Sequence, residues 1–543
     1  MTAPLVDIRN LHVALPDGAD RPYAVEDLSM TLNAGEIVCV VGESGSGKSL
    51  TARAMMGLLP EPRVRASAGQ IIFGGRDLLQ LPKHERRLLC GEQLSMIFQE
   101  PMTALNPLMT VGRQIEEVLI VHTSLSAAER MERVLALLAE VHLPDPPRIA
   151  ASYPHQLSGG QRQRAMIAMA LIMDPKVLVA DEPTTALDVT TQAQILKLIR
   201  ELQHLHGTGV MFITHDFGVV AEVADRILVM QHGKVVETGT ADQILNRPEA
   251  PYTRALIRAI PSLTPRSRTP IEGVPILKVE DLDKTYRQSG LLAKGREVHA
   301  AKDVSFTLKR GETIGIVGES GSGKSTVARM IVRLLQPDGG RIDLHGIDLA
   351  PLSKRQLKPH RRRVQMVFQD PYASLNPRRK IGEIICEGPV ANGVPKSKAM
   401  ARARELLGLV GLKPEVAERF PHEFSGGQRQ RIGLARALAM DPEVLVADEP
   451  VSALDVSVQA QVLELLAEIR DRLGLSVVFI THDLRVAAQV CDTIVVMSKG
   501  EVVEHGTLAE VFADPKHAYT RELLASIPGK DWQIPELAEA GAV

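Results

Sequence analysis

Cysteine and long apolar runs are both scarce in this sequence. The 543 residues hold four cysteines, Cys39, Cys90, Cys386 and Cys491, and no two of them form a C-x-x-C pair. Disulfide frameworks and zinc or iron–sulfur sites need closely spaced cysteines, so the sequence favours neither and fits a reducing compartment. The longest unbroken apolar run, 165–173, has nine residues, whereas a membrane-spanning helix needs about 20. We therefore expect no membrane span.

An excess of one charge is also missing. Lys and Arg number 63 against 65 for Asp and Glu, a net charge of -2, so no global cationic field attracts nucleic acid. Near the N-terminus, Asp7 and Arg9 interrupt the apolar stretch that a secretion signal would need. Hydrophobic residues make up 45% and charged residues 24%, which is ordinary for globular proteins, and the length predicts several domains.

The chain contains two copies of one unit. VGESGSGKS occurs at 41–49 and 317–325, and FQEP/FQDP, SGGQRQR, VLVADEP and FITHD follow in the same order in both copies. The first motifs are 276 residues apart, the glutamines 270, and all later motifs 267. Length changes between the motifs therefore fall before SGGQRQR. This is expected if the later segments build a shared site while upstream surface loops vary.

Four segments follow from the repeat. We predict a first domain with a C-terminal extension at 1–262, a proline-rich linker at 263–276, a second domain with its extension at 277–528 and a tail at 529–543. The tail holds the only tryptophan and no clear period, and we expect it at the surface.

The predicted fold class is α/β. In each copy a β-branched strand leads into a glycine-rich turn and a helix, and a second apolar strand precedes Asp-Glu. Alternating strands and helices predict a mostly parallel sheet covered on both faces. The stretches between Gln99 and Ser158 and between Gln369 and Ser425 are mainly helical in pattern, with amphipathic segments at 126–141 and 398–410, and predict an inserted helical subdomain.

The glycine-rich turns match G-x-x-x-x-G-K-S, in which backbone N–H groups surround phosphates at a helix N-terminus. The lysine contacts the terminal phosphates and the serine hydroxyl ligates magnesium. A single match can arise by chance, but two copies, each after a strand, predict phosphate binding. The ATP-binding residues predicted here are Gly42, Ser44, Gly45, Ser46, Gly47, Lys48, Ser49 and Leu50, and Gly318, Ser320, Gly321, Ser322, Gly323, Lys324, Ser325 and Thr326.

Carboxylates end the second apolar strand of each copy. Alone, an Asp-Glu pair or a histidine at a strand end is more often structural; the fixed spacing to the phosphate motifs favours function here. We predict catalytic roles for Glu182 and Glu449 as the groups that polarise water, for His215 and His482 as contacts to the γ-phosphate, and for Gln99 and Gln369. The predicted Mg²⁺ ligands are Ser49, Gln99, Asp181, Ser325, Gln369 and Asp448.

A second glycine-rich motif precedes a helix in each copy and predicts another anion-binding site. Its residues are Ser158, Gly159, Gly160 and Gln161, and Ser425, Gly426, Gly427 and Gln428. One nucleotide rarely needs two such sites from one domain. The simplest arrangement is head-to-tail pairing, in which each copy closes over the ATP of the other.

This order of motifs resembles the ABC-transporter ATPase family over nearly the whole chain. The resemblance implies two tandem RecA-like P-loop domains, each with an inserted helical subdomain, and two ATP sites in which Lys48 faces Ser425 and Lys324 faces Ser158. The segments 185–188 and 452–455 match the D-loop that crosses such an interface. Tyr286 is the candidate for stacking on adenine in the second copy, whereas Leu15 stands at that place in the first, which predicts weaker nucleotide binding there.

A narrower resemblance lies after each core, at 250–261 and 518–528. These segments are similar to the C-terminal extension of dipeptide, oligopeptide and nickel importer ATPases. That resemblance implies hydrolysis of ATP with Mg²⁺, two integral-membrane permease partners, an extracytoplasmic solute-binding protein, and a peripheral place on the cytoplasmic side of the inner membrane. No nucleic acid is expected. Coupling helices of the permeases would enter a groove beside Gln99 and Gln369.

Three alternatives compete with the importer subunit. A soluble tandem ABC ATPase acting on ribosomes or RNA would carry a long charged helical linker, whereas the linker here is short and proline-rich. A DNA-repair ABC ATPase would need zinc-binding cysteine pairs. A non-hydrolysing regulator is disfavoured by the two intact Asp-Glu pairs.

Overall fold

The computed structural model describes residues 3–185, 187–266, 271, 273–287, 297–452 and 454–535. The chain divides into two compact units. The first takes in the described residues of Met1–Leu187, Thr191–Ile260 and Pro528–Val543, and the second those of Asp188–Thr190 and Pro261–Ile527. Each unit is built on one copy of the repeat.

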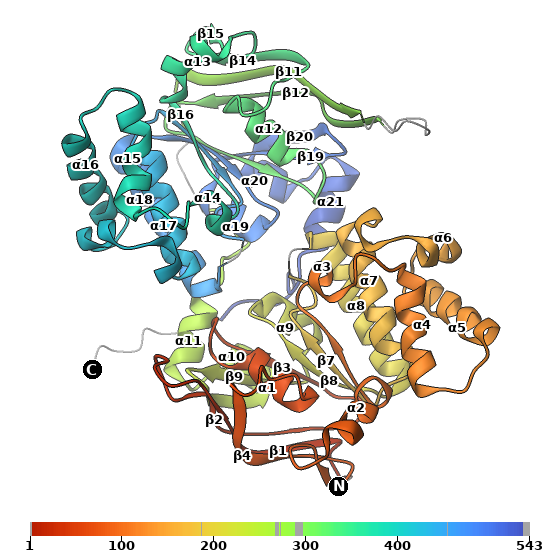
Figure 1. The fold of residues 1–543 in the computed structure, drawn as a ribbon. Coiled ribbons are helices and arrows are strands. Elements are labelled where there is room, and N and C mark those ends of the chain that lie inside the picture. Colours follow the sequence, from red (N-terminus) through yellow and green to blue (C-terminus); the bar gives the residue numbers. More distant parts are fainter. Residues whose placement is uncertain are drawn as a thin grey trace. The chain divides into compact units, whose positions relative to one another are not determined.

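The first unit has a six-stranded core sheet (Figure 1). Its order is β10-β9-β3-β8-β7-β6, with β10 antiparallel to β9 and the other neighbours parallel. The strands are β3 (Ile37–Val41), β6 (Leu94–Ile97), β7 (Val177–Asp181), β8 (Gly209–Ile213), β9 (Arg226–Gln231) and β10 (Lys234–Thr240). Every residue of β3, β7 and β8 is buried, because parallel strands covered on both faces need an unbroken apolar sequence. The predicted α/β class is confirmed.

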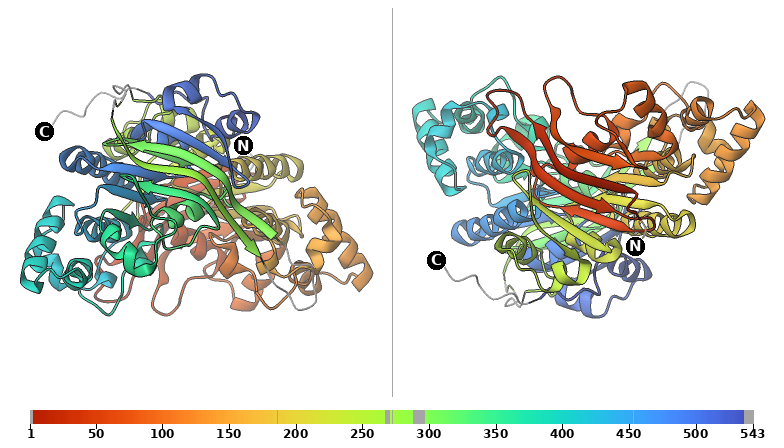
Figure 2. Two further views of the ribbon diagram at one scale, coloured as in Figure 1. Left: turned by 90° about the horizontal axis from the view of Figure 1, so that it is seen from above. Right: turned by 90° about the horizontal axis from the view of Figure 1, so that it is seen from below.

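An antiparallel sheet that the sequence patterns did not predict accompanies each core sheet. In the first unit its order is β2-β1-β4-β5, with β1 (Val6–Ala14), β2 (Tyr23–Leu32), β4 (Arg65–Phe73) and β5 (Arg76–Asp77). In the second unit it is β12-β11-β14-β15, with β11 (Pro275–Arg287), β12 (Glu297–Lys309), β14 (Gly339–Leu344) and β15 (Ile347–Asp348). Figure 2 shows the long, twisted strands of these sheets, red in the right panel and green in the left.

A helical subdomain follows β6 in the first unit, as predicted. It comprises α3 (Pro101–Ala104), α4 (Val111–His122), α5 (Ala127–Glu140), α6 (Pro146–Ala151) and α7 (Gly159–Leu171). Helix α5 begins at a capping box in which Ser126 and Glu129 satisfy each other's backbone N–H groups. Its buried face, Val134, Leu137 and Leu138, belongs to the same apolar cluster as the core strands. The remaining helices are α1 (Lys48–Met56), α2 (Lys83–Glu92), α8 (Val189–His206), α9 (Phe217–Val223), α10 (Ala241–Asn246) and α11 (Pro251–Arg258).

The second unit repeats this architecture. Its core sheet has the order β16-β17-β18-β13-β19-β20, with β13 (Thr313–Val317), β16 (Val364–Val367), β17 (Val444–Asp448), β18 (Ser476–Ile480), β19 (Thr493–Ser498) and β20 (Glu501–Thr507). Its helices are α12 (Lys324–Ile331), α13 (Lys354–Arg361), α14 (Pro371–Ser374), α15 (Ile381–Ala391), α16 (Lys396–Leu409), α17 (Gly426–Leu438), α18 (Val456–Leu473), α19 (Leu484–Val490), α20 (Leu508–Ala513) and α21 (Ala518–Ala525). None of the described helices combines the length and apolar character that crossing a bilayer requires.

The segments expected to be linker and tail each pack into a unit where they are described. Leu263, at the start of the predicted linker, lies against the apolar core of the second unit, while residues 267–270 and 272 lie outside the described residues. The start of the predicted tail groups with the first unit: Trp532 and Ile534 pack against its apolar cluster, and Trp532 Nε1 donates to Asn246 Oδ1 at 3.0 Å. An indole offers a large apolar area, and contact with the cluster removes part of that area from water.

Candidate active site

The glycine-rich loop of each unit joins a buried strand to a helix, as the sequence predicted. In the first unit β3 ends at Val41 and α1 begins at Lys48. Gly42 has φ of +146°, and a Cβ at this position would lie 2.1 Å from the carbonyl oxygen of Met230. Gly318 repeats both features, with φ of +148° and the oxygen of Met497 at 2.1 Å. Only glycine fits so close a backbone approach.

The loop lysines are buried and turn back onto their own loops. Lys48 Nζ donates to the carbonyl oxygens of Gly42 at 2.6 Å and Glu43 at 2.9 Å. Lys324 Nζ donates in the same way to Gly318 at 2.8 Å and Glu319 at 2.7 Å. Burial lowers the pKa of Lys324 from its usual value, while nearby carboxylates, Glu449 first, act against that shift. The ammonium groups thus lie inside the loops, where phosphates would add their own negative charge.

The remaining predicted loop residues differ in exposure. Ser44 and Gly45, like Ser320 and Gly321, are exposed at the tips of the loops, whereas Ser46 and Ser322 are buried. Leu50 and Thr326 lie on the first turns of α1 and α12.

A serine hydroxyl and a carboxylate meet beside each lysine. Ser49 Oγ donates to Asp181 Oδ1 at 2.9 Å, and Ser325 Oγ donates to Asp448 Oδ1 at 3.0 Å. Burial raises the pKa of both aspartates, with the serine hydrogen bond acting against it. Hydroxyl and carboxylate oxygens are the ligands that Mg²⁺ prefers. The donor set therefore fits this ion, and residues far apart in the sequence have been brought to one point.

The predicted catalytic side chains also converge. Glu182 follows the end of β7, and its carboxylate accepts from Gln99 Nε2 at 2.8 Å and from Thr185 Oγ1 at 2.9 Å. His215 Nδ1 lies 3.3 Å from Glu182 Oε1. In the second unit Gln369 Nε2 donates to Glu449 Oε2 at 2.9 Å, and His482 Nδ1 lies 3.2 Å from that oxygen.

Both glutamates are held in the ionised form. Burial would raise the pKa of Glu182, but the hydrogen bond and charge of His215, then Thr185 and Lys48, outweigh it and lower the pKa to about 2. For Glu449 the same opposition, with His482 as the main partner, also lowers the pKa. Both glutamates have positive φ, +48° and +45°, an unusual backbone for a non-glycine residue that sequence patterns do not reveal.

The second glycine-rich motif forms a helix N-terminus. Ser158 caps α7: its Oγ accepts from Gln161 N at 3.3 Å while Gln161 Oε1 accepts from Ser158 N at 3.0 Å. Ser425 and Gln428 form the same capping box on α17. Next to them, Gly159 has open space at its Cβ position, and a Cβ on Gly426 would meet only an ordinary contact at 3.6 Å. The motif therefore offers an accessible backbone at a helix start, which suits an anion.

The two copies differ at the predicted adenine position. Tyr286 lies near the end of β11 with 44% of its surface exposed. Leu15 directly follows β1 and is partly buried against the apolar cluster of the antiparallel sheet. The ring of Tyr23 meets that of His12 edge-on, with centroids 5.3 Å apart. The structure therefore places an exposed aromatic ring at this position in the second unit and a partly buried leucine in the first. The effect of this difference on ATP affinity stays a prediction.

Sequence patterns missed one pair of site residues, Tyr252 and Tyr519. Each belongs to the extension after its core, and its hydroxyl accepts from a backbone N–H of the glycine-rich loop: Glu43 N to Tyr252 at 3.2 Å and Glu319 N to Tyr519 at 2.9 Å. The repeated YTR within both extensions was the available signal.

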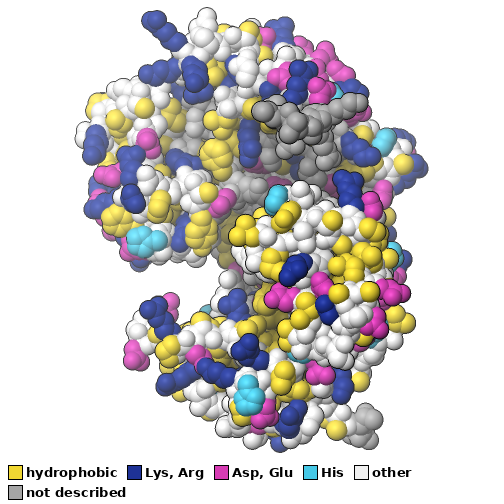
Figure 3. All heavy atoms as spheres, turned by 45° about the vertical axis from the view of Figure 1, so that its right-hand side comes forward, with side chains coloured by type: hydrophobic (Ala, Val, Ile, Leu, Met, Phe, Trp, Pro, Cys, Tyr) yellow, Lys and Arg dark blue, Asp and Glu magenta, His cyan; other side chains and the backbone are white. Residues whose placement is uncertain are grey.

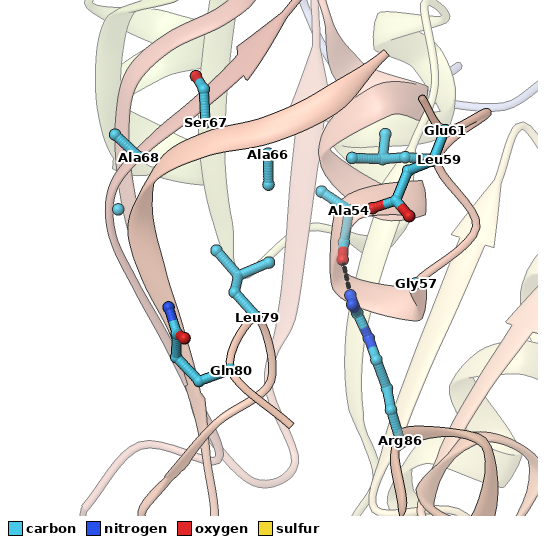
Figure 4. Close-up of a pocket in the computed structure, with 11 residues that line it drawn as sticks. Ala54, Gly57, Leu59, Glu61, Ala66, Ser67, Ala68, Leu79, Gln80 and Arg86 are labelled. Atoms are coloured by element: carbon cyan, nitrogen blue, oxygen red, sulfur yellow. Dashed lines mark hydrogen bonds between the residues drawn. The ribbon is translucent and has the colours of Figure 1, made fainter. Parts of the chain in front are cut away.

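A separate cavity of about 160 Å³ lies between the end of α1 and β4 (Figure 4). Arg86 extends into it, and its guanidinium donates to the carbonyl oxygen of Ala54 near the end of α1. A cation at a helix C-terminus stabilises the carbonyls that lack helical partners. The lining includes none of the predicted ATP-binding residues; the Arg86 contact stabilises the end of the helix that follows the loop.

The surface carries charge of both signs. On the face drawn in Figure 3, Lys and Arg side chains are interspersed with Asp and Glu, in keeping with the net charge of -2. That nucleic acid is not a partner stays a prediction.

Comparisons with known proteins agree with this geometry. The ABC transporter family matches residues 25–185 and 301–452, and the oligopeptide/dipeptide transporter C-terminal region matches 236–286 and 503–540. The chain is 47% identical to the glutathione import ATP-binding protein GsiA of Escherichia coli O157:H7, over 96% of this chain and 89% of that protein. It is 46% identical to the peptidoglycan transport ATP-binding protein YejF of Agrobacterium fabrum, over 97% and 96%.

Among solved structures, a dimeric ATP-binding cassette, MJ0796 bound to ADP and Pi, is 32% identical, with 43% of this chain and 98% of that chain covered and a TM-score of 0.39. The two family matches together span more than half of the chain. The predicted ATP binding, ATPase activity and extension are confirmed at the level of the family. The chain belongs to the ABC transporter family, as an ATP-binding subunit with two tandem ATPase domains of the oligopeptide/dipeptide type.

Proposed function

We propose that this chain is the ATP-hydrolysing subunit of an importer for peptides or related small solutes. One observation carries the proposal: both units hold an intact cluster of glutamate, histidine and glutamine beside a glycine-rich loop. Two intact clusters argue for two hydrolytic sites, since a regulatory subunit has no need of either. The relatives named for glutathione import and for peptidoglycan transport support a cargo with peptide character.

The glutamates act on water mainly by orientation. Phosphoryl transfer needs positioned groups and charge stabilisation more than a strong base. A carboxylate whose pKa is about 2 is a weak base, but it is fully ionised at neutral pH and accepts a hydrogen bond from water reliably. Gln99 and His215, which contact Glu182, fix the direction of its oxygens. Glu449, Gln369 and His482 do the same in the second unit.

The loops bind and orient the nucleotide. Lys48 and Lys324 exchange their loop carbonyls for the terminal phosphates, which offer full negative charge. Mg²⁺, when bound, neutralises charge on the phosphate oxygens. Ser49 with Asp181 and Ser325 with Asp448, each pair already in contact, would hold the ion together with Gln99 and Gln369.

Each ATP is completed by the other copy in a head-to-tail arrangement. In this proposal Ser425 and its glycines close over the nucleotide on Lys48, and Ser158 closes over the nucleotide on Lys324. The support comes from each unit by itself: besides the glycine-rich loop, α7 and α17 each begin with a glycine whose Cβ position is unobstructed. The D-loops, 185–188 and 452–455, would cross between the copies.

The partners are membrane proteins. ABC transporter ATPases act with membrane permease subunits, and importers act with a solute-binding protein. We propose two integral-membrane permeases, an extracytoplasmic binding protein and a peripheral place on the cytoplasmic side of the inner membrane. Coupling helices of the permeases would dock beside Gln99 and Gln369. The proposed domain limits are 1–262, 263–276, 277–528 and 529–543.

The test is affinity purification of the tagged chain from detergent-solubilised native membranes, followed by mass spectrometry. Two multi-span membrane proteins, absent when an untagged strain is processed in parallel, are the expected result. Ribosomal proteins and RNA without membrane partners would replace the importer with the soluble tandem ATPase that acts on ribosomes.

A further inference from the structure

One peptide bond of each glycine-rich loop is held from both sides. In the first unit this is the peptide between Gly42 and Glu43. Its carbonyl oxygen accepts from Lys48 Nζ at 2.6 Å, and its N–H donates to the Tyr252 hydroxyl at 3.2 Å. Lysine and tyrosine therefore hold opposite edges of the same peptide plane.

The tyrosine reaches the loop because its helix is fixed at its start. Tyr252 is the second residue of α11, whose N-terminal Ala250 has no side-chain cap of its own. Glu237, from β10, supplies the missing acceptors: its two carboxylate oxygens accept from Glu249 N at 2.7 Å and Ala250 N at 3.2 Å. A carboxylate at a helix N-terminus stabilises the unpaired N–H groups there. The chain of contacts runs from Glu237 through α11 to the loop.

The second unit reproduces this chain of contacts. Glu319 N donates to the Tyr519 hydroxyl at 2.9 Å while Lys324 holds the Gly318 carbonyl at 2.8 Å. Glu504, in β20, accepts from Lys516 N at 2.7 Å and His517 N at 3.1 Å. Burial raises the pKa of Tyr519 to about 12, so its hydroxyl stays neutral at physiological pH. Two independent copies with the same contacts argue against coincidence.

We propose that Tyr252 and Tyr519 are positioning residues of the two ATP sites. Each lysine ammonium has three N–H donors and now gives two of them to loop carbonyls, so a bound phosphate competes with those carbonyls for the donors. When a phosphate weakens the lysine contact to this carbonyl, the tyrosine hydroxyl still holds the N–H of the same peptide and restrains its rotation. The C-terminal extension thereby sets how well the loop binds nucleotide. This goes beyond the proposed function, because it holds for the purified chain whatever the cargo.

The test compares Tyr252→Phe, Tyr519→Phe and the double variant with the parent. Phenylalanine keeps the ring packing and removes only the hydroxyl. We expect ATP binding to weaken about two- to tenfold at each altered site, the usual effect of one lost hydrogen bond. The kcat at saturating ATP should stay near the parent value. Tyr153→Phe, at a partly exposed tyrosine outside both loops, is the matched control and should change nothing.

Backbone hydrogen exchange gives a second readout. Exchange at Glu43 and Glu319 should quicken in the phenylalanine variants, while strands β3 and β13 stay protected. Glu237→Ala should raise the KM for ATP as Tyr252→Phe does, and Glu237→Gln, which keeps one acceptor oxygen, should recover most of the parent affinity.

Two results would overturn the proposal. One is unchanged ATP affinity together with unchanged exchange at the loop amides. The other is a fall of both kcat and the unfolding midpoint while the KM for ATP stays unchanged. The tyrosines would then stabilise the fold without acting on nucleotide binding. Neither result bears on the purification of membrane partners, so failure here and failure of the importer assignment can be told apart.

Discussion

Among single residues, Glu182 and Glu449 combine three features that suit a group acting on water. Each is ionised, has an unusual positive φ and is contacted by a glutamine and a histidine that lie far away in the sequence. Backbone strain persists only where the surroundings hold it in place. Here the contacts of each carboxylate with its glutamine and histidine are part of those surroundings.

Replacing both glutamates should stop turnover without releasing ATP. In Glu182→Gln combined with Glu449→Gln, the amide no longer offers the charged acceptor, and steady-state hydrolysis should fall by at least about 10²-fold. ATP binding should remain, because the loop lysines are untouched. Phosphate release and equilibrium nucleotide binding measure the two effects. Hydrolysis at the parent rate would contradict the role given to the glutamates.

The His482–Glu449 contact predicts a pH dependence of stability. Burial lowers the pKa of His482, but the hydrogen bond and charge of Glu449 outweigh it and raise the pKa above the ordinary 6.5; the pKa of Glu449 is lowered below 4.5. The contribution of His482 to the free energy of unfolding is complete below pH 6.5 and is lost as pH rises through its raised pKa. The glutamate contribution is complete above pH 4.5 and is lost as pH falls through the lowered pKa.

The stabilisation should therefore be largest between about pH 4.5 and 6.5. His482→Gln should cost on the order of 1–2 kcal/mol at pH 6 and clearly less at pH 9. Thermal unfolding at several pH values measures this, with His505→Gln, an exposed histidine in the same unit, as the control. A cost that does not change with pH would refute the ion pair.

Introducing an aromatic residue at the predicted adenine position of the first unit should tighten ATP binding. Leu15→Tyr, studied with Lys324→Ala so that only the first loop binds, should improve ATP affinity about fivefold or more, since a base stacked on an aromatic ring gains about 1–3 kcal/mol. Leu205→Tyr, at an exposed position of α8, is the control. Equal affinity before and after the substitution of Leu15 would remove the proposed asymmetry.

Which residues come together could be predicted from the sequence where repetition fixed the register, and their roles stay predictions. Gln99, Glu182 and His215 are weak signals singly, but their recurrence beside a glycine-rich loop brought them together correctly. Tyr252 was not found, because a hydroxyl that contacts a backbone N–H needs no particular spacing from the loop. The positive φ of Glu182 was also hidden, since local sequence does not force it.

Among the elements, α7 and α17 show two glycines with different tasks. In α17 a Cβ on Gly426 would meet only an ordinary contact at 3.6 Å, whereas a Cβ on Gly427 would lie 2.3 Å from Val458 Cγ1 of α18. Gly160 of α7 faces Thr191 of α8 in the same way, at 2.7 Å. The second glycine therefore permits close packing of two helices, and the first leaves the helix start open.

Alanine should separate these tasks. Gly427→Ala should destabilise the second unit by about 1–3 kcal/mol through overpacking against α18. Gly426→Ala should leave the unfolding midpoint unchanged or slightly higher, because alanine favours the helix, yet lower ATP hydrolysis if the helix start binds phosphate. Calorimetry and ATPase assays on both variants measure this. Equal destabilisation of the second unit by the two variants would contradict the different tasks given to Gly426 and Gly427.

The core sheets were predictable and the antiparallel sheets were not. Strands such as β7 and β17 are continuous apolar runs, which is what burial on both faces requires. In β1 the pairing register shifts between Ile8 and Leu11 and again before Ala14. Such bulges break the two-residue alternation that identifies a strand, so the outer sheet left no clear pattern.

For the whole molecule, the head-to-tail proposal predicts which copy touches which nucleotide. With Lys324→Ala, only the first loop binds ATP. A photoreactive group on the terminal phosphate should then label the peptide that contains Ser425, and with Lys48→Ala the peptide that contains Ser158. Peptide mass spectrometry identifies the labelled segment. Label on the serine motif of the same copy would overturn the arrangement.

The repeat predicted two units, and the chain divides into two compact units; the predicted limits stay a prediction. Proline-rich sequence predicted an interdomain linker, and a short aperiodic end predicted a surface tail. The packing of Leu263 and Trp532 into apolar clusters depends on surfaces formed by distant residues, and a local window of sequence does not contain that information.

Trp532 gives the molecule a built-in optical label. It is the only tryptophan among 543 residues. It belongs to the first unit and is hydrogen-bonded to Asn246. Its emission should report the melting of that unit, into which its ring packs, whereas circular dichroism records both units. Where the two signals diverge during unfolding, the two ATPase domains lose their structure at different points, without any probe being attached.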